Sequence, residues 1–293
     1  MKFKEALANK RFVVTTEVHP PIDDTPDGIL KNLELIRGRV DGVTVPDQEI
    51  EGVVADTVNT CALLQENRFE AIYQTTTRDK NRLQIQKDLL RAHDGGVENL
   101  LVFTEDYRIT GDSLQETMFF HVDTGKFSSV LEHLKEGVTV DGKDLPYKAQ
   151  FSFGSGIESK WGKEVPDLEM KEMEAITAKG AGYFLTTPVF HIGVFEKFMK
   201  RVKGFGIPVI AEVMILRTAG MARFLNRHVK SGLVPDRYIQ KLSKAPDRQK
   251  ASIEIFTEIV SGLKELCDGV HIITIGAEEK LRYYLDEARL KRL

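Results

Sequence analysis

Residues 69–106 read FEAIYQTTTRDKNRLQIQKDLLRAHDGGVENLLVFTED, and this stretch decides the fold. Its two ends, residues 69–77 and 99–106, are short runs rich in apolar, β-branched and aromatic residues. Residues 81–96 between them have helix length and apolar residues at helical spacing. A strand, a helix and a second strand in this order are typical of a parallel sheet with helical crossovers.

The same alternation continues in both directions from this stretch. Eight strands, each followed by helix, are the number that closes a (β/α)8 TIM barrel, which we expect to form a single domain over residues 1–293. An open doubly wound sheet is the alternative, but the G-x-G-x-x-G turn typical of its first strand is absent here. The predicted strands are residues 11–18, 41–47, 69–77, 99–106, 147–155, 183–190, 207–216 and 269–276.

Composition restricts the classes of partner. Hydrophobic residues make up 42% and charged residues 29%, as in soluble globular proteins. The formal net charge of -3 gives no basic surface for nucleic acid or an anionic membrane. The start lacks an apolar signal core and no stretch is long enough to span a membrane, so we expect a cytoplasmic protein. Cys61 and Cys267 are the only cysteines, and the seven histidines show no metal-ligand spacing, so no metal site is expected.

Polar residues gather where the predicted strands end. In a TIM barrel the carboxyl ends of all strands meet at one face, which carries the active site. The residues expected there are Glu17, Thr44, Asp47, Gln74 to Arg78, Asp106, Ser152 to Ser155, Thr186, Thr187, Glu212 and Thr274.

Glu17 lies in TTEVHPP, residues 15–21, at the end of the first strand. Burial at the rim would raise the pKa of this carboxyl, which suits a general acid. The alternative is a structural role, as a cap or as the partner of an arginine such as Arg78. Asp106 has the same two interpretations, because an aspartate after a strand is often a turn or helix cap. His19 could touch a ligand or be structural, and His271, inside a strand, is expected to serve packing.

Several segments, in order, resemble the methylenetetrahydrofolate reductase family, flavoproteins that reduce 5,10-methylenetetrahydrofolate to 5-methyltetrahydrofolate. They include TTEVHPP, residues 75–106, ITGD (109–112), AGYFLTTPVF (181–190) and GIPVIAEVMIL (206–216). RFLNRHVKSGLVPD (223–236) and DGVHIITIG (268–276) extend the resemblance over nearly the whole chain. It implies a (β/α)8 barrel that holds a flavin, FAD or alternatively FMN, in one-carbon metabolism.

The resemblance also implies residue roles. Glu17 takes the position of the family's essential acid, which would protonate N10 so that the methylene bridge opens to an iminium cation. Asp106 takes that of the aspartate beside flavin and pterin, where its charge would stabilise the cation. We therefore expect catalytic Glu17 and Asp106, flavin contacts from Thr44, Gln74, Thr76, Thr104, Asp106 and Phe153, and substrate contacts from Glu17, Asp106, Thr187 and Glu212.

Four positions depart from the family pattern. Thr186-Thr187 stand where the family has T-Q, and Gln74 stands where many members have histidine. Residues 104–106 read T-E-D in place of T-G-D, and Ile176 replaces a basic residue. These departures concern the nicotinamide and flavin contacts, so the electron donor is either NAD(P)H or a redox partner subunit.

Two other functions fit the same residues. A pterin-binding barrel methyltransferase would need no flavin, and a non-catalytic barrel subunit of a redox complex would have no physical need for paired rim carboxylates. The expected small-molecule partner is methylenetetrahydrofolate or a related pterin. The Lys- and Glu-rich surface helices neither demand nor exclude an oligomer.

Overall fold

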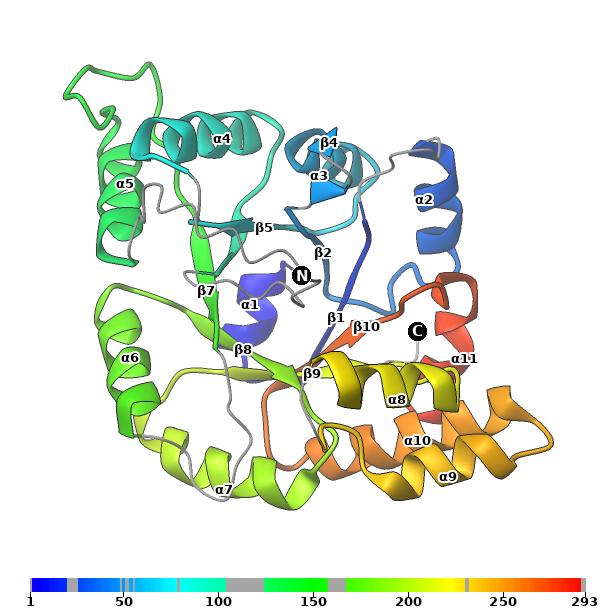
Figure 1. The fold of residues 1–293 in the computed structure, drawn as a ribbon. Coiled ribbons are helices and arrows are strands. Elements are labelled where there is room, and N and C mark those ends of the chain that lie inside the picture. The colour runs from blue at the N-terminus through cyan, green and yellow to red at the C-terminus, as the bar shows by residue number, and fades with distance from the viewer. Residues whose placement is uncertain are drawn as a thin grey trace.

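The computed structural model describes residues 2–19, 26–47, 49–50, 53–54, 56–77, 80–103, 124–157, 167–229 and 232–290. Parallel strands close into a barrel in the order β1-β10-β9-β8-β7-β6-β5-β2, as the sequence predicts (Figure 1). That residues 1–293 form a single domain stays a prediction. The barrel strands are β1 (Val13–Glu17), β2 (Gly42–Val45), β5 (Ala71–Thr76), β6 (Asn99–Phe103), β7 (Ser152–Gly156), β8 (Tyr183–Pro188), β9 (Val209–Met214) and β10 (Gly269–Ile273).

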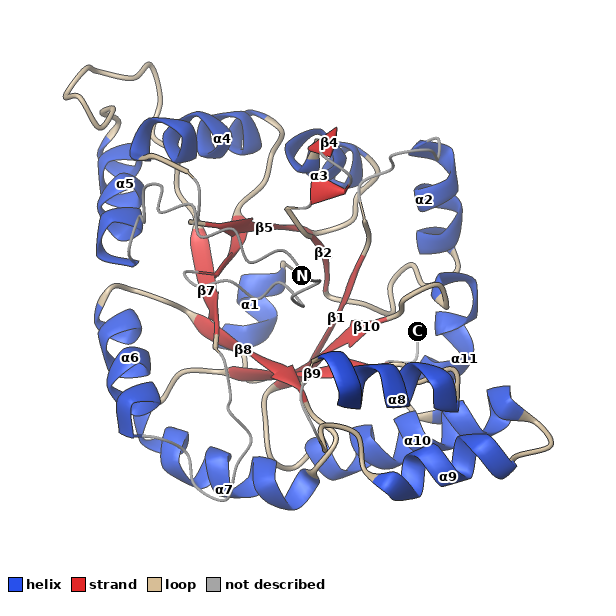
Figure 2. Cartoon of the chain, viewed as in Figure 1, coloured by secondary structure: helices blue, strands red, loops and turns tan. Residues whose placement is uncertain are grey.

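Helices surround this ring of strands (Figure 2). Several begin at a side-chain cap, such as Asn81, whose side chain accepts a hydrogen bond from the backbone N–H of Gln84. The helices are α1 (Phe3–Ala8), α2 (Pro26–Glu34), α3 (Thr57–Glu66), α4 (Arg82–Asp94), α5 (Thr124–Glu136), α6 (Asp167–Ala178), α7 (Ile192–Val202), α8 (Ala219–His228), α9 (Asp236–Lys244), α10 (Arg248–Leu263) and α11 (Leu281–Glu287), with 3-10 turns η1 (Lys203–Phe205) and η2 (Glu278–Lys280).

The predicted strand at residues 147–155 begins later than expected, at Ser152. The residues before it pair with helices instead of with a strand. The Ala149 N–H donates to the carbonyl of Leu134 in α5, and the Tyr147 hydroxyl donates to Asp94 in α4. A second difference is the short antiparallel pair of β3 (Glu49–Ile50) and β4 (Val53–Val54), which the sequence pattern did not predict.

Apolar side chains close the end of the barrel at which the strands begin. Helix α1 lies within the ring of strands in Figure 1, and its buried Phe3 ring packs edge-on against Tyr183 at 5.3 Å between centroids. The same interior cluster contains Val13, Ile72 and Ile210, all near the amino ends of their strands. The carboxyl ends of the strands therefore form the end of the barrel that a ligand can reach.

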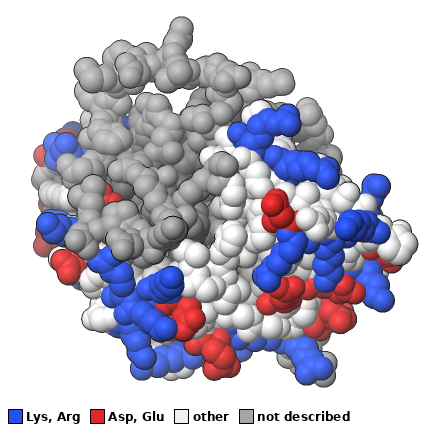
Figure 3. Space-filling model, turned by 60° about the horizontal axis from the view of Figure 1, so that its bottom comes forward, with Lys and Arg blue, Asp and Glu red and all other residues white. Residues whose placement is uncertain are grey.

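Charged side chains of both signs are interspersed along the right and lower parts of the face shown in Figure 3. Helices α9 and α10 are joined at the surface by two ion pairs, Arg237 to Glu258 and Lys241 to Glu254, each at 2.9 Å. Exposed pairs of this kind contribute little to stability. Among the described residues, no helix combines the length and the apolar character that a membrane span requires.

Gly156 offers a test of packing inside the barrel. A Cβ at this position would lie 1.9 Å from the Phe103 ring, so we expect Gly156→Ala to destabilise the protein by about 1–3 kcal/mol. Gly193→Ala in α7 is the matched control, because a Cβ there meets nothing within 4 Å. Urea unfolding of both variants measures the difference. Equal stabilities would show that the Phe103 ring has room to move.

Candidate active site

Glu17 is the last residue of β1, and its side chain is only 11% exposed. One carboxylate oxygen lies 3.3 Å from Nε2 of His19, and the other lies 3.8 Å from Nε2 of His271 on β10. The Thr15 hydroxyl lies 2.9 Å from Nδ1 of His271. The Thr15 hydroxyl thus contacts one ring nitrogen of His271, and the other ring nitrogen faces Glu17.

The environment of Glu17 lowers its pKa. Burial opposes ionisation, as the sequence predicts, but the contacts with His19 and His271 outweigh it and lower the pKa of Glu17 to about 2. The prediction of a raised pKa is therefore wrong. Glu17 is a carboxylate at neutral pH, and its ion-pair partners are histidines.

Glu212 on β9 faces the same group of residues. It pairs in register with His271 of β10, which in turn pairs with Thr15 of β1. Burial and then the charge of Glu17 raise the pKa of Glu212 well above its ordinary value. Within the described part of the chain, no ion pair or hydrogen bond reaches its carboxyl group. The barrel interior thus contains two carboxyl groups with pKa values shifted in opposite directions.

Thr44 lies on β2, the strand next to that of Glu17, and Gln74 and Thr76 lie on β5, one strand further round the barrel. A Cβ at Gly42 would lie 2.8 Å from Ile72, an interior residue, so Gly42 faces the interior. Side chains alternate along a strand, so Thr44 faces inward two residues after Gly42, as do Gln74 and Thr76 after Ile72. Thr44 is buried, whereas Gln74 and Thr76 are partly exposed.

Thr187 is the second-last residue of β8, the strand that pairs with Glu212's strand β9. The register between β8 and β9 shifts between Leu185 and Pro188, and Pro188 pairs with Glu212. The backbone N–H of Glu212 donates to the Thr186 hydroxyl at 3.3 Å. The two threonines that replace the family's T-Q pair therefore lie beside the backbone of Glu212.

Among the remaining predicted residues that the structure describes, Phe153 does not join this group. The Phe153 ring packs on Phe127 of α5, 6.0 Å between centroids, in the layer between the barrel and its helices. Ile176 is buried in the same layer. Thr104 and Asp106 lie outside the described residues.

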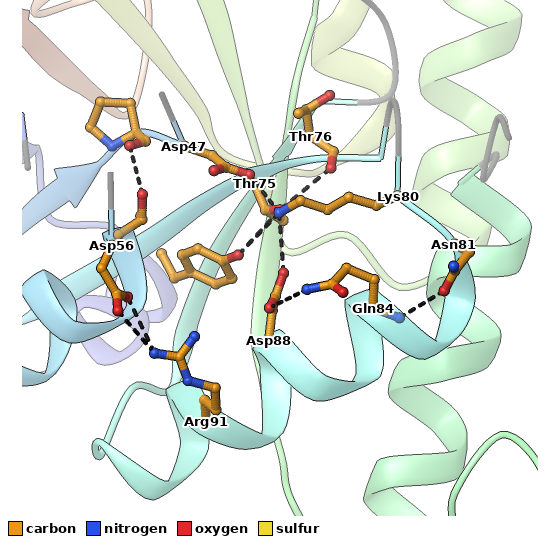
Figure 4. A network of polar contacts seen from close by, with 12 residues as sticks. Asp47, Asp56, Thr75, Thr76, Lys80, Asn81, Gln84, Asp88 and Arg91 are labelled. Carbon is orange, nitrogen blue, oxygen red and sulfur yellow. Dashed lines mark hydrogen bonds and ion pairs between the residues drawn. The ribbon is translucent and has the colours of Figure 1, made fainter. Parts of the chain in front are cut away.

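A buried lysine organises the loops next to the site (Figure 4). Nζ of Lys80 lies 3.3 Å from Asp88 of α4 and is hydrogen-bonded to Asp47, which follows β2, and to Thr75 of β5. All three charged side chains are at most 17% exposed. Gln84 also donates to Asp88 at 3.0 Å. This network ties the carboxyl ends of β2 and β5 to α4.

Removing the lysine charge should destabilise the fold. Lys80→Met leaves Asp47 and Asp88 without their shared cation, and we expect the free energy of unfolding to fall by about 3 kcal/mol. Lys143→Met is the control, because Lys143 is 79% exposed and pairs only with Asp141 in the described part of the chain. This control should change stability by less than about 0.5 kcal/mol. Equal losses in urea unfolding would contradict a special role for Lys80.

The sequence matches the family model of methylenetetrahydrofolate reductase over residues 2–288. The chain belongs to the methylenetetrahydrofolate reductase family. This membership confirms the resemblance that the ordered segments indicate. Within the described residues of this family member, no cluster of three or more His, Cys, Asp or Glu could hold a metal ion.

Solved structures share the fold of this methylenetetrahydrofolate reductase family member at low sequence identity. An uncharacterized protein from Clostridium thermocellum, described as binding two copies of 5-methyl-5,6,7,8-tetrahydrofolic acid, is 15% identical with a TM-score of 0.67, over 97% of this chain and 96% of that one. Tryptophan synthase from M. tuberculosis is 13% identical with a TM-score of 0.53, over 98% and 92%. A 2,3-dimethylmalate lyase is 13% identical with a TM-score of 0.53, over 98% and 84%. No curated protein matches the sequence.

Proposed function

We propose that this protein catalyses the flavin-dependent reduction of 5,10-methylenetetrahydrofolate to 5-methyltetrahydrofolate. Its family membership supports this reaction, and the methyltetrahydrofolate bound by the Clostridium thermocellum protein supports a folate as the ligand of this barrel type. The observation that carries the proposal is Glu17, an ionised carboxylate held by two histidines at the open end of the barrel.

The inward-facing residues fit a flavin. The hydroxyls of Thr44 and Thr76 and the amide of Gln74 offer both donors and acceptors on the adjacent strands β2 and β5. The pyrimidine edge of a flavin carries carbonyl oxygens and an N–H, which such side chains can bind. A bound flavin would supply the hydride that reduces the methylene carbon. FAD is the form we propose, with FMN as the alternative.

Glu17 acts on the folate in this proposal. Opening of the methylene bridge leaves a positive charge at N5, and a fixed carboxylate in a partly dry site stabilises a developing cation. His19 and His271 hold Glu17 in its charged form, while Thr15 orients His271. Asp106 is proposed to assist in holding the pterin.

The first test is the visible spectrum of the purified protein before and after denaturation, with the released chromophore identified by mass. We expect about one flavin per chain, and oxidation of the photoreduced flavin when 5,10-methylenetetrahydrofolate is added without air. A protein that contains no flavin and binds none on reconstitution would refute the proposal. That result would favour the pterin methyltransferase, which needs no flavin.

The electron donor is a separate prediction. Because Thr186-Thr187 replace the T-Q pair, we expect turnover of the isolated protein to be faster with a reduced viologen dye than with NADH or NADPH. Steady-state assays with the three donors measure this difference. Brisk turnover with a nicotinamide would remove the need for a redox partner subunit.

Location in the cytoplasm, an oligomeric state and the absence of nucleic-acid partners stay predictions.

A further inference from the structure

Lys80 joins the ends of two neighbouring strands at the point where their backbone pairing stops (Figure 4). Among the described residues, the last pair in the register of β2 and β5 is Val45 with Tyr73. Asp47 lies two residues after Val45, and Thr75 lies two residues after Tyr73. The Lys80 ammonium is hydrogen-bonded to both Asp47 and Thr75. It therefore bridges two positions that would face each other if the ladder continued.

The backbone of β2 cannot continue the ladder directly. Pro46 follows the last residue of β2 and has no N–H to donate to β5. The Pro46 carbonyl accepts a hydrogen bond at 3.1 Å from the hydroxyl of Thr57, the first residue of α3. The side chain of Lys80 thus supplies a link between β2 and β5 that the backbone does not supply at this level.

Helix α4 holds the ammonium group in place. Asp88 of α4 lies 3.3 Å from Nζ of Lys80, and Gln84 donates to Asp88 at 3.0 Å. Asn81 caps α4 directly after Lys80, so the backbone of the lysine is fixed by the start of the helix. The side chains of Lys80 and Asp88 are 17% and 12% exposed, and water therefore competes little for their contact.

The residues proposed to bind the flavin project from the opposite side of the same strands. Gln74 and Thr76 face the barrel interior, whereas Thr75 between them faces outward, toward α4. Thr44 faces inward from β2, three residues before Asp47. The spacing between the ends of β2 and β5 therefore sets the distance from Thr44 to the two β5 side chains. Ligand-binding side chains must be held to within about 0.5 Å to act together.

We propose that Lys80 is a positioning residue for the flavin, because its bridge between Asp47 and Thr75 fixes the spacing of the strands that carry the flavin-binding side chains; this inference rests on the proposed function. Lys80 does not touch the flavin in this proposal, since its ammonium lies on the outer side of the strands. Without this ammonium, Asp47 and Asp88 would repel each other across a buried space, and the ends of β2 and β5 would move apart.

Titration of the flavin-free protein with FAD, followed by flavin fluorescence, tests this role. We expect Lys80→Met to raise the Kd for FAD by about 10-fold or more, since groups that orient metal-binding side chains typically change affinity by about 10–100-fold.

Leu263→Ala is the matched control for loss of stability. Leu263 is fully buried in α10, which packs against β9 on the side of the barrel opposite β5. Truncation of a buried leucine destabilises a fold about as much as the loss of one partner of a buried ion pair. Urea unfolding of both flavin-free variants checks the match. Leu263→Ala should bind FAD with the wild-type Kd.

Thr75→Val separates the bridge from the charge. Valine keeps the shape of threonine and leaves the contacts of Lys80 with Asp47 and Asp88 in place, but it removes the hydroxyl through which Lys80 holds β5. We expect this variant to raise the Kd for FAD more than Leu263→Ala does and less than Lys80→Met does.

The outcomes distinguish this inference from the proposed function. A Kd for Lys80→Met no higher than that of Leu263→Ala would overturn the positioning role, and so would a wild-type Kd in Thr75→Val. If Lys80→Met does not fold, Thr75→Val alone decides. A wild type that binds no flavin would refute the proposed function and this inference with it.

Discussion

Glu17→Gln is expected to slow the reduction of 5,10-methylenetetrahydrofolate by about 10²–10³-fold, the typical effect of removing one preorganised electrostatic group. An amide has nearly the shape of the carboxylate, but it has no charge to stabilise the cation at N5. It would also leave His19 and His271 without the anion that they now contact. Single-turnover oxidation of the reduced protein by the folate measures the chemical step directly.

The expected pattern separates catalysis from binding. The loss should fall on kcat and on kcat/KM alike, because the interaction with the cation exists only after the methylene bridge opens. Flavin content and the unfolding midpoint serve as checks that the variant is folded. Glu196→Gln, at an exposed ion pair with Lys200, is the control and should react at the wild-type rate. A wild-type rate in Glu17→Gln would show that this carboxylate does not act on the cation.

The fold could be predicted because its signal is repeated along the chain. Each barrel strand is a short run of apolar and β-branched residues followed by a helix with its own apolar face, and eight such units close a barrel. Where the structure differs from the prediction, contacts between residues distant in sequence determine the local structure. Residues 147–151 have strand-like composition, but Tyr147 and Ala149 bond to α4 and α5. The two-residue strands β3 and β4 are too short to show the alternation of apolar and polar residues by which a strand is predicted.

The site could be predicted only in part. The sequence places Glu17, Thr44, Gln74 and Glu212 at strand ends, but a residue's face depends on strand register, and a shift of one residue reverses it. Phe153 therefore could be expected at the site, although its ring packs outward on Phe127.

The importance of His271 was missed for a related reason. The residue is 254 positions from Glu17 in sequence, and although a closed barrel pairs its last strand with its first, the run GVHIITIG does not indicate the register of that pair. The alternation of Gly269, His271 and Ile273 along the strand was the only local signal that His271 faces the barrel interior. Without this histidine, burial alone predicts a raised pKa for Glu17, opposite to the direction in the structure.

Glu17 and Glu212 should make opposite contributions to the dependence of stability on pH. The pKa of Glu17 is lowered to about 2 in the folded protein, so its contribution is present above about pH 4.3, the unfolded value, and is lost as the pH falls toward 2. The loss of this contribution amounts to about 3 kcal/mol, since each unit of pKa shift corresponds to about 1.4 kcal/mol. In Glu17→Gln, stability should therefore depend less on pH in this acid range.

For Glu212 the sign is reversed. Its pKa is raised in the folded protein, so above about pH 4.3 the folded state binds a proton that the unfolded state releases. The wild type should lose up to about 1.4 kcal/mol per pH unit from this residue until the folded-state pKa is reached. We therefore expect Glu212→Gln to gain stability relative to the wild type as the pH rises from about 5 to 8. Urea unfolding across this range measures the gain, with the exposed Glu265→Gln as a control that should stay within about 0.5 kcal/mol of the wild type. A constant difference between Glu212→Gln and the wild type would mean that Glu212 ionises in the folded protein as it does in the unfolded chain, and the barrel would then hold two carboxylates with no proton between them.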